Sequence, residues 1–205
     1  MTAIIDYGVG NLFSLLSSLK KIGEDAVVTA DPKLLDEADR IILPGVGAFC
    51  DAAAKLNDSG LVPELKKQIA LGKPVMGICL GMQLMFDKSF EYGEYAGLGL
   101  IRGEIRPIAE QVKDLKIPHM GWNALHFENG KHPLFKYISE GDHVYFVHSF
   151  CAVNCAESLI ASTGYGVQIT AAAASGNVMG CQFHPEKSGT VGLNILKAFA
   201  EVEAC

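Results

Sequence analysis

Apolar runs and amphipathic stretches alternate through the first half of the chain. Continuous apolar residues predict buried strands at residues 3–5, 26–28, 40–43 and 75–78. Between these runs, apolar residues recur at helical spacing over 12–22 and 61–71, and a glycine follows each stretch. Strands that alternate with helices favour parallel βαβ units.

The second half of the chain has a different pattern. Shorter β-like runs occur at 122–127, 143–147 and 178–183, and a closing helix is expected over 190–202. We find no repeats, low-complexity tracts or linker-like segments. The pattern predicts one α/β domain over residues 1–205, with a mostly parallel central sheet flanked by helices and a smaller antiparallel β portion.

Composition narrows the class of protein. The 205 residues are 49% hydrophobic and 20% charged, which is typical of a globular domain with a substantial core. A formal charge of −6 with scattered basic residues gives no footprint for nucleic acid. No apolar run reaches the roughly 20 residues that span a bilayer, and residues 1–6 resemble a first strand and not a signal peptide. We therefore expect a cytoplasmic protein without membrane contact.

Cysteine spacing favours a reduced protein. The six cysteines lie at irregular intervals, at positions 50, 79, 151, 155, 181 and 205. A chain of this size needs no disulfide staples, and no secretory signal accompanies them. Cys151 and Cys155 could form half of a zinc site, but no second pair of ligands lies at suitable spacing. We expect neither a metal nor a cofactor.

Candidate chemistry gathers where predicted strands end. Ligands of open α/β sheets bind at the carboxyl ends of the strands. Three unusual segments follow predicted strands, at residues 6–11, 44–49 and 77–83. We therefore expect these segments to lie near one another.

The third segment resembles a nucleophile elbow built on a thiol. Cys79 lies between Gly77 and Gly81, at a point where a strand turns abruptly into a helix. Glycine tolerates the close approach and unusual dihedral angles of such a corner. A helix N-terminus also favours the thiolate, which is the attacking form. The alternative is that Cys79 is a small buried hydrophobe.

A downstream motif supplies the groups that a cysteine nucleophile needs. Such a nucleophile requires a base, and the base requires a third group that holds its orientation. His184 and Glu186 lie two apart in an extended segment stiffened by Pro185, so Glu186 can orient the imidazole that serves Cys79. The expected catalytic unit is Cys79, His184 and Glu186.

Two glycine loops allow different interpretations. Gly8 and Gly10 follow the first strand, but the third glycine and the later acid of a dinucleotide site are missing. The loop from Pro44 to Phe49 is more suggestive, because its N–H groups can be aimed at a developing oxyanion beside the elbow. A simple strand-to-helix turn is the alternative for this loop.

Taken in order, these motifs resemble those of the class I (triad) glutamine amidotransferases. The shared segments are Pro44–Phe49, Gly77–Gln83 and Phe183–Ser188. Within the family, the segments at 6–12, 118–123 and 145–150 are most similar to the glutaminase subunits that serve a cyclase in histidine biosynthesis. The resemblance covers essentially the whole chain and implies the class I glutamine amidotransferase fold.

The resemblance also implies roles for individual residues. Cys79 would attack the carboxamide of glutamine, with His184 as base and Glu186 orienting it. The oxyanion would be held by main-chain N–H groups of Leu80 and of Val46 or Gly47. The amino-acid end of the substrate would be bound by Gln83, Glu91, Ser149 and Phe150.

A partner is implied as well. In the family, ammonia passes to a (β/α)₈-barrel cyclase subunit in a heterodimer, and positions at or near that interface match Asn11, Trp122, Tyr145 and Lys187. Two other interpretations stay open. One is another enzyme on the same scaffold, such as the glutaminase of pyridoxal phosphate synthase or a γ-glutamyl hydrolase. The other is a non-catalytic docking subunit, which the intact Cys79, His184 and Glu186 disfavour.

Overall fold

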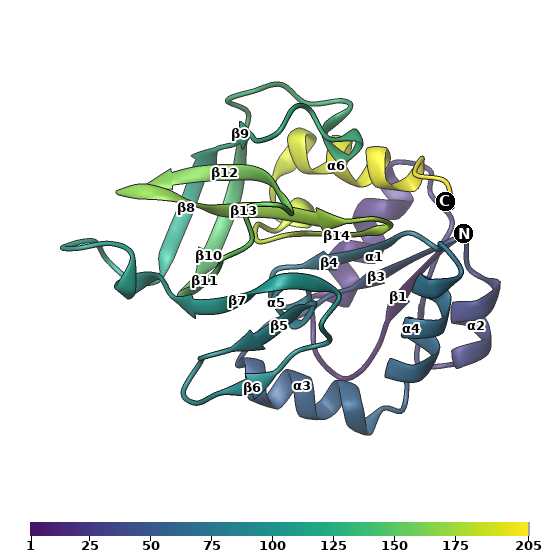
Figure 1. Ribbon diagram of the computed structural model, residues 1–205. Helices are drawn as coiled ribbons and strands as arrows, with labels where there is room; N and C mark the ends of the chain where they lie inside the picture. Colours follow the sequence, from purple (N-terminus) through teal and green to yellow (C-terminus); the bar gives the residue numbers. More distant parts are fainter. Residues whose placement is uncertain (205) are drawn as a thin grey trace.

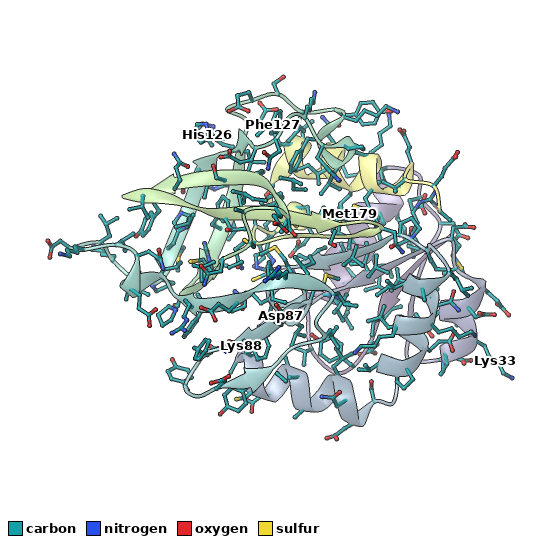
Figure 2. The ribbon with its side chains drawn as sticks, in the orientation of Figure 1. Lys33, Asp87, Lys88, His126, Phe127 and Met179 are labelled. Carbon is teal, nitrogen blue, oxygen red and sulfur yellow. The ribbon has the colours of Figure 1, made fainter. Side chains whose placement is uncertain are left out.

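An eight-stranded sheet forms the centre of the computed structural model, which describes residues 1–204 (Figure 1). In spatial order its strands are β2 (Ala26–Thr29), β1 (Thr2–Ile5), β3 (Arg40–Leu43), β4 (Val75–Ile78), β14 (Val178–Cys181), β13 (Val167–Ser175), β12 (Leu159–Tyr165) and β9 (His126–Phe127). The first five strands run parallel, and the last three continue the sheet in antiparallel pairing. Figure 2 labels Met179 on β14 within the sheet and His126 and Phe127 at its β9 edge.

Helices cover both faces of the parallel half. They are α1 (Leu12–Lys21), α2 (Pro32–Glu37), α3 (Phe49–Asp58), α4 (Val62–Ala70), α5 (Leu80–Leu84) and α6 (Gly189–Ala200), with 3₁₀ turns η1 (Ile108–Glu110), η2 (Pro133–Phe135) and η3 (Pro185–Lys187). Side chains alternate across each strand, so Ile4 of β1 packs in the cluster that holds α1 and α6. Its neighbours Ala3 and Ile5 pack in the cluster that holds α2, α3 and α4.

Two smaller sheets are built from the middle of the chain. One pairs β10 (His143–His148) with β8 (His119–Ala124), and the other has the order β11 (Phe150–Val153), β7 (Ile101–Pro107), β5 (Phe86–Ser89) and β6 (Tyr95–Ala96). Both lie on the side of the molecule away from the chain termini (Figure 1). This is also the side toward which the parallel strands β1, β3 and β4 point their carboxyl ends (Figure 1).

The predicted fold class is confirmed, with differences in detail. The apolar run 122–127 is divided between β8 and β9, which belong to different sheets, and Leu125 between them belongs to neither strand. The run 178–183 is a strand only as far as Cys181. Helix α3 and the hairpin of β12 and β13 were not among the predicted elements. In the part of the chain that is described, we find no helix that meets the length and hydropathy needed to cross a membrane.

Candidate active site

Cys79 occupies the corner between β4 and α5. Its backbone has φ 54° and ψ −112°, a conformation that a residue other than glycine adopts only when its surroundings impose it. The flanking glycines provide the close approach expected of them, but they do not adopt the unusual dihedral angles, because neither has a positive φ. A Cβ on Gly77 would lie 2.6 Å from the Met82 nitrogen, and one on Gly81 would overlap the Leu43 carbonyl oxygen. The strained dihedral belongs to Cys79, and the glycines permit close packing.

The loop that follows β3 packs directly on this corner. A Cβ on Gly45 would lie 2.7 Å from the Gly81 nitrogen, so only glycine fits. The buried Tyr7 hydroxyl donates to the Pro44 carbonyl at 2.7 Å and anchors the start of the loop. Gly47 has φ 95°, in the region that favours glycine. Among the described residues, the N–H groups of Val46 and Gly47 donate to no protein acceptor.

His184 reaches the same place from β14. Because β14 pairs with β4 in parallel, both strands end at the same edge, and the chain beyond β14 passes beside Cys79. The His184 main chain is fixed on both sides, since its N–H donates to the Tyr145 carbonyl at 3.0 Å and its carbonyl accepts from Ser188 Oγ at 2.7 Å. His184 Nδ1 lies 2.8 Å from Glu186 Oε1, and both side chains are buried. Nε2 is therefore the ring nitrogen left for Cys79.

The electrostatics of His184 suit proton transfer. Burial alone would lower the pKa of His184, but hydrogen bonds to Cys79 and to Glu186 together raise the pKa to about 9. With so high a pKa, the imidazole firmly holds a proton that it takes from Cys79, and it can later deliver that proton to a leaving nitrogen. The expected unit of Cys79, His184 and Glu186 is thus assembled in a geometry that allows nucleophilic catalysis.

A cavity of about 380 Å³ opens on Cys79. We call it the Cys79 cavity. Ten of the residues predicted from sequence line it: Val46, Gly47, Cys79, Leu80, Gln83, Glu91, Ser149, Phe150, His184 and Lys187. Four others complete the wall: Tyr92, Pro118, Val147 and His148. The volume is within the range of small-molecule binding sites.

Two residues that line the cavity carry fixed polar groups. Gln83 Nε2 donates to the Phe150 carbonyl at 3.2 Å and to Gln182 Oε1 at 2.9 Å, which holds the amide in place. Glu91 is 8% exposed, and one carboxylate oxygen accepts from the Phe49 N–H at 2.6 Å. Burial raises the pKa of Glu91, while the bond from Phe49 opposes this. A buried carboxylate facing a cavity is suited to an ammonium group.

The residues expected at the partner interface divide into two groups. Trp122, 53% exposed, has its ring centroid 5.7 Å from that of Tyr145, and Lys187 Nζ lies 5.8 Å from the Tyr145 ring. These three residues form one surface beside the Cys79 cavity. Asn11 precedes α1 and lines a separate small space of about 10 Å³ together with Glu186.

Sequence reasoning did not assign roles to two residues that support the site. Gln182 is fully buried, and its Nε2 lies 3.6 Å from Cys79 Sγ while its Oε1 accepts from Gln83. Its position two residues before His184 was the available signal. Tyr7 holds the loop at Pro44. A buried tyrosine beside two glycines gives no hint of that contact.

Thiol reagents are expected to modify Cys79 first. Burial raises the pKa of Cys151 to about 12 and raises that of Cys181 well above its usual range, whereas Cys79 lines an open cavity. Brief alkylation followed by peptide mapping should therefore find label at Cys79 well before either of them. The half-buried Cys50 serves as the accessible control, and Cys205 lies outside the described residues. Equal early labelling of Cys151 would contradict the expectation.

The family model for class-I glutamine amidotransferases matches residues 3–202. The chain therefore belongs to the class-I glutamine amidotransferases and is an enzyme of that class. Within the class it is similar to proteins named imidazole glycerol phosphate synthase subunit HisH. The one from Geobacter sulfurreducens is 47% identical over 206 residues, with 98% of each chain covered. The one from Caldanaerobacter subterraneus is 48% identical, with 100% of each chain covered.

Solved structures share the fold at lower identity. A crystal structure described as a glutamine amidotransferase superposes with a TM-score of 0.75 at 19% identity, covering 98% of this chain and 99% of that one. The structure of PurLQS from Thermotoga maritima gives a TM-score of 0.74 at 22% identity, covering 97% and 96%. These likenesses support the architecture described above.

Proposed function

We propose that this chain is the glutaminase subunit of an imidazole glycerol phosphate synthase in histidine biosynthesis. It hydrolyses glutamine to glutamate and ammonia and passes the ammonia to a cyclase subunit. The observation that carries the proposal is Cys79 on a strained corner, facing a cavity, with the buried His184–Glu186 pair beside it. Near-full-length similarity to subunits of that synthase supports the choice within the class.

The catalytic steps follow from the positions of these groups. Cys79 Sγ attacks the carboxamide carbon, and His184 takes up the thiol proton. The oxyanion accepts hydrogen bonds from the main-chain N–H of Leu80 and from that of Val46 or Gly47. His184 then passes this proton to the amide nitrogen, the C–N bond breaks, and ammonia leaves a thioester on Cys79. Water attacks the thioester, glutamate leaves, and the thiol is restored.

The other end of glutamine is bound by further residues that line the cavity. Glu91 is the partner for the α-ammonium, because its buried carboxylate has one oxygen beyond the bond from Phe49. Gln83 and the main chain at Ser149 and Phe150 provide polar groups for the α-carboxylate and for orientation. The reacting carboxamide then lies against Cys79.

The partner is a (β/α)₈-barrel cyclase that forms a heterodimer with this chain in the cytoplasm. It uses the ammonia to convert a formimino-aminoimidazole carboxamide ribonucleotide into imidazole glycerol phosphate and 5-aminoimidazole-4-carboxamide ribonucleotide. Asn11, Trp122, Tyr145 and Lys187 form the docking surface. Ammonia released into water would be protonated and would lose its nucleophilicity, so docking beside the Cys79 cavity keeps it reactive.

The test combines this chain with purified partners. Glutamine hydrolysis and imidazole glycerol phosphate formation are measured with the cyclase, and in parallel with the synthase subunit of pyridoxal phosphate synthase. We expect glutamine-dependent product only with the cyclase. Activity with the second partner alone would assign the chain to another synthase. Binding to the cyclase without any glutamine hydrolysis would make the chain a docking subunit.

Replacing Trp122 with alanine is expected to weaken partner binding more than folding. The side chain is half exposed, lies beside the Tyr145 ring and belongs to none of the buried clusters, so its loss leaves the core unchanged. An interface aromatic of this kind contributes about 2 kcal/mol or more, which corresponds to a roughly thirtyfold weaker Kd for the cyclase. Calorimetric titration of the cyclase with each variant measures this Kd. The matched control is Tyr137→Ala, an exposed aromatic beside α6, and an equal loss in both variants would contradict the docking surface.

A further inference from the structure

Two buried histidines lie beside the Cys79 cavity and have no part in the proposed steps. His119 on β8 and His148 on β10 are directly opposite each other in the strand register. His119 Nδ1 lies 2.9 Å from His148 Nε2, and the two residues are 1% and 6% exposed. A hydrogen bond between two imidazoles needs one proton on one of the two nitrogens. The rest of the network decides where that proton is.

The two rings belong to a line of four hydrogen bonds, which we call the histidine chain. At one end, His148 Nδ1 lies 2.8 Å from the Phe150 carbonyl oxygen. At the other end, His119 Nε2 lies 2.9 Å from Asn123 Oδ1, and Asn123 Nδ2 donates to the Gly164 carbonyl at 3.0 Å. The chain therefore starts and finishes on carbonyl oxygens, which can only accept.

A proton count shows what the histidine chain requires. Its four contacts need four protons. Each neutral imidazole supplies one, and the Asn123 amide supplies one within the histidine chain, so one proton is missing. Exchanging the oxygen and nitrogen of the Asn123 amide moves the shortfall to Gly164 without removing it. With both rings neutral, one contact would set two acceptors against each other at hydrogen-bond distance. All four contacts are satisfied only when the pair of rings carries one added proton.

Of the two rings, His119 is the one that takes up the added proton more readily. Burial lowers the pKa of His148 to about 3, so His148 is the neutral ring and donates through Nδ1 to Phe150. Burial also lowers the pKa of His119, and the bond to Asn123 opposes this. The titratable groups packed against His119 are His148 from β10 and Tyr165 from β12, whose ring stacks at 4.1 Å. The charge of His184 lowers the pKa of His148 further. Aromatic faces such as that of Tyr165 stabilise an imidazolium.

The histidine chain ends on an atom of the substrate wall. The Phe150 carbonyl accepts from His148 and also from Gln83 Nε2, so two side chains fix the direction of this peptide group. Ser149 and Phe150 form part of the Cys79 cavity, and their main chain turns between β10 and β11. A change in the Phe150 peptide would therefore move the surface against which the substrate lies.

We propose that His119, acting through His148, is a positioning residue that fixes the Phe150 carbonyl for glutamine binding. All four hydrogen bonds of the histidine chain form only when the pair of rings carries one added proton. The part of the inference that concerns glutamine rests on the proposed function. The role predicts a specific signature: KM for glutamine changes, while kcat changes little, because Cys79 and His184 are untouched. It also predicts that KM rises as pH rises through the titration of His119.

Two variants of His119 separate the hydrogen bond from the charge. His119→Asn places an amide N–H where Nδ1 was, so it keeps the donor to His148 but does not titrate. His119→Leu removes both. Loss of one buried hydrogen bond is worth about three- to tenfold, so at a pH where wild-type His119 is protonated we expect KM to rise by that factor in the leucine variant. The asparagine variant should have a low KM that no longer depends on pH. His143→Asn, an exposed histidine on β10, is the control and should behave as wild type.

Nitrogen-15 NMR of histidine-labelled wild-type protein tests the proton count without any activity. We expect His148 to carry a proton on Nδ1 only, and His119 to carry protons on both nitrogens at the acid end of the range in which the fold is intact. A neutral His119 at every such pH would overturn the proton assignment. A leucine variant that folds with KM within twofold of wild type would overturn the positioning role. If the wild-type enzyme with its cyclase hydrolyses no glutamine, the proposed function fails, and the NMR result still decides the proton count.

Discussion

Replacing Cys79 with alanine is expected to abolish glutamine hydrolysis and to leave the fold and the docking surface intact. The nucleophile has no substitute, because the thioester requires its sulfur, and removal of one member of such a unit costs on the order of 10⁴–10⁶ in kcat. The side chain is small and lines a cavity, so its loss should cost about 1 kcal/mol of unfolding free energy. Steady-state assays of glutamate release, together with thermal unfolding, measure both effects.

Ammonia supplies the control for this result. The Cys79→Ala complex, given free ammonia in place of glutamine, should make imidazole glycerol phosphate at the wild-type ammonia-dependent rate. Failure of this rescue would mean that the substitution disturbs assembly. Cys79→Ala protein that still hydrolyses glutamine at the wild-type rate would refute the nucleophile assignment. His184→Ala should be about as damaging, and Glu186→Gln less so, because Glu186 orients the imidazole and transfers no proton.

The parallel half of the fold and the catalytic unit were predictable from sequence for physical reasons. Strands buried on both faces have continuous apolar runs, and helices that cover them have apolar stripes, so both can be recognised locally. Cys79 and His184 were recognisable because each lies just beyond such a strand. Parallel pairing then brings the strand ends to the same edge of the sheet.

The β12–β13 hairpin was not predictable in the same way. Strand β13 contains four consecutive alanines at 171–174, and alanine has a weak preference for strands. The first three are fully buried, so their conformation is imposed by neighbouring strands and not by local preference. Tertiary context determines this part of the sheet.

Contacts that support the site lie far apart in the sequence, which explains why they were missed. Gln182 and Cys79 are separated by 103 positions, and Tyr7 and Pro44 by 37. For the elbow glycines, the predicted close approach is confirmed, but the predicted unusual dihedral angle lies at Cys79 and not at the glycines. Distances between elements decide such roles, and a single sequence does not contain those distances.

The cyclase, carrying its ligand, is expected to raise the glutaminase rate of this chain by at least about 10²–10³, the cost of one missing oxyanion donor. The physical reason lies in the loop at Val46 and Gly47. Its N–H groups have no protein acceptor among the described residues, and Gly47 has a positive φ with open space around it, so the loop can adopt more than one backbone conformation. Docking at Asn11, which lines the same small space as Val46, can select the conformation that aims a donor at the oxyanion.

The measurement is glutamine turnover by the isolated chain, by the chain with cyclase, and by the complex with a cyclase substrate analogue. Gly47→Ala changes the backbone preference without a steric clash, because an added Cβ contacts no atom but disfavours φ 95°. It should reduce the stimulated rate strongly. Gly176→Ala, at a positive φ in the β13–β14 turn with equally open space, should cost only about 1 kcal/mol of stability. Equal turnover in all three conditions would refute the stimulation by the cyclase. The assignment of Cys79, His184 and Glu186 would stand, because the chemistry of the thioester does not depend on when the oxyanion donor is supplied.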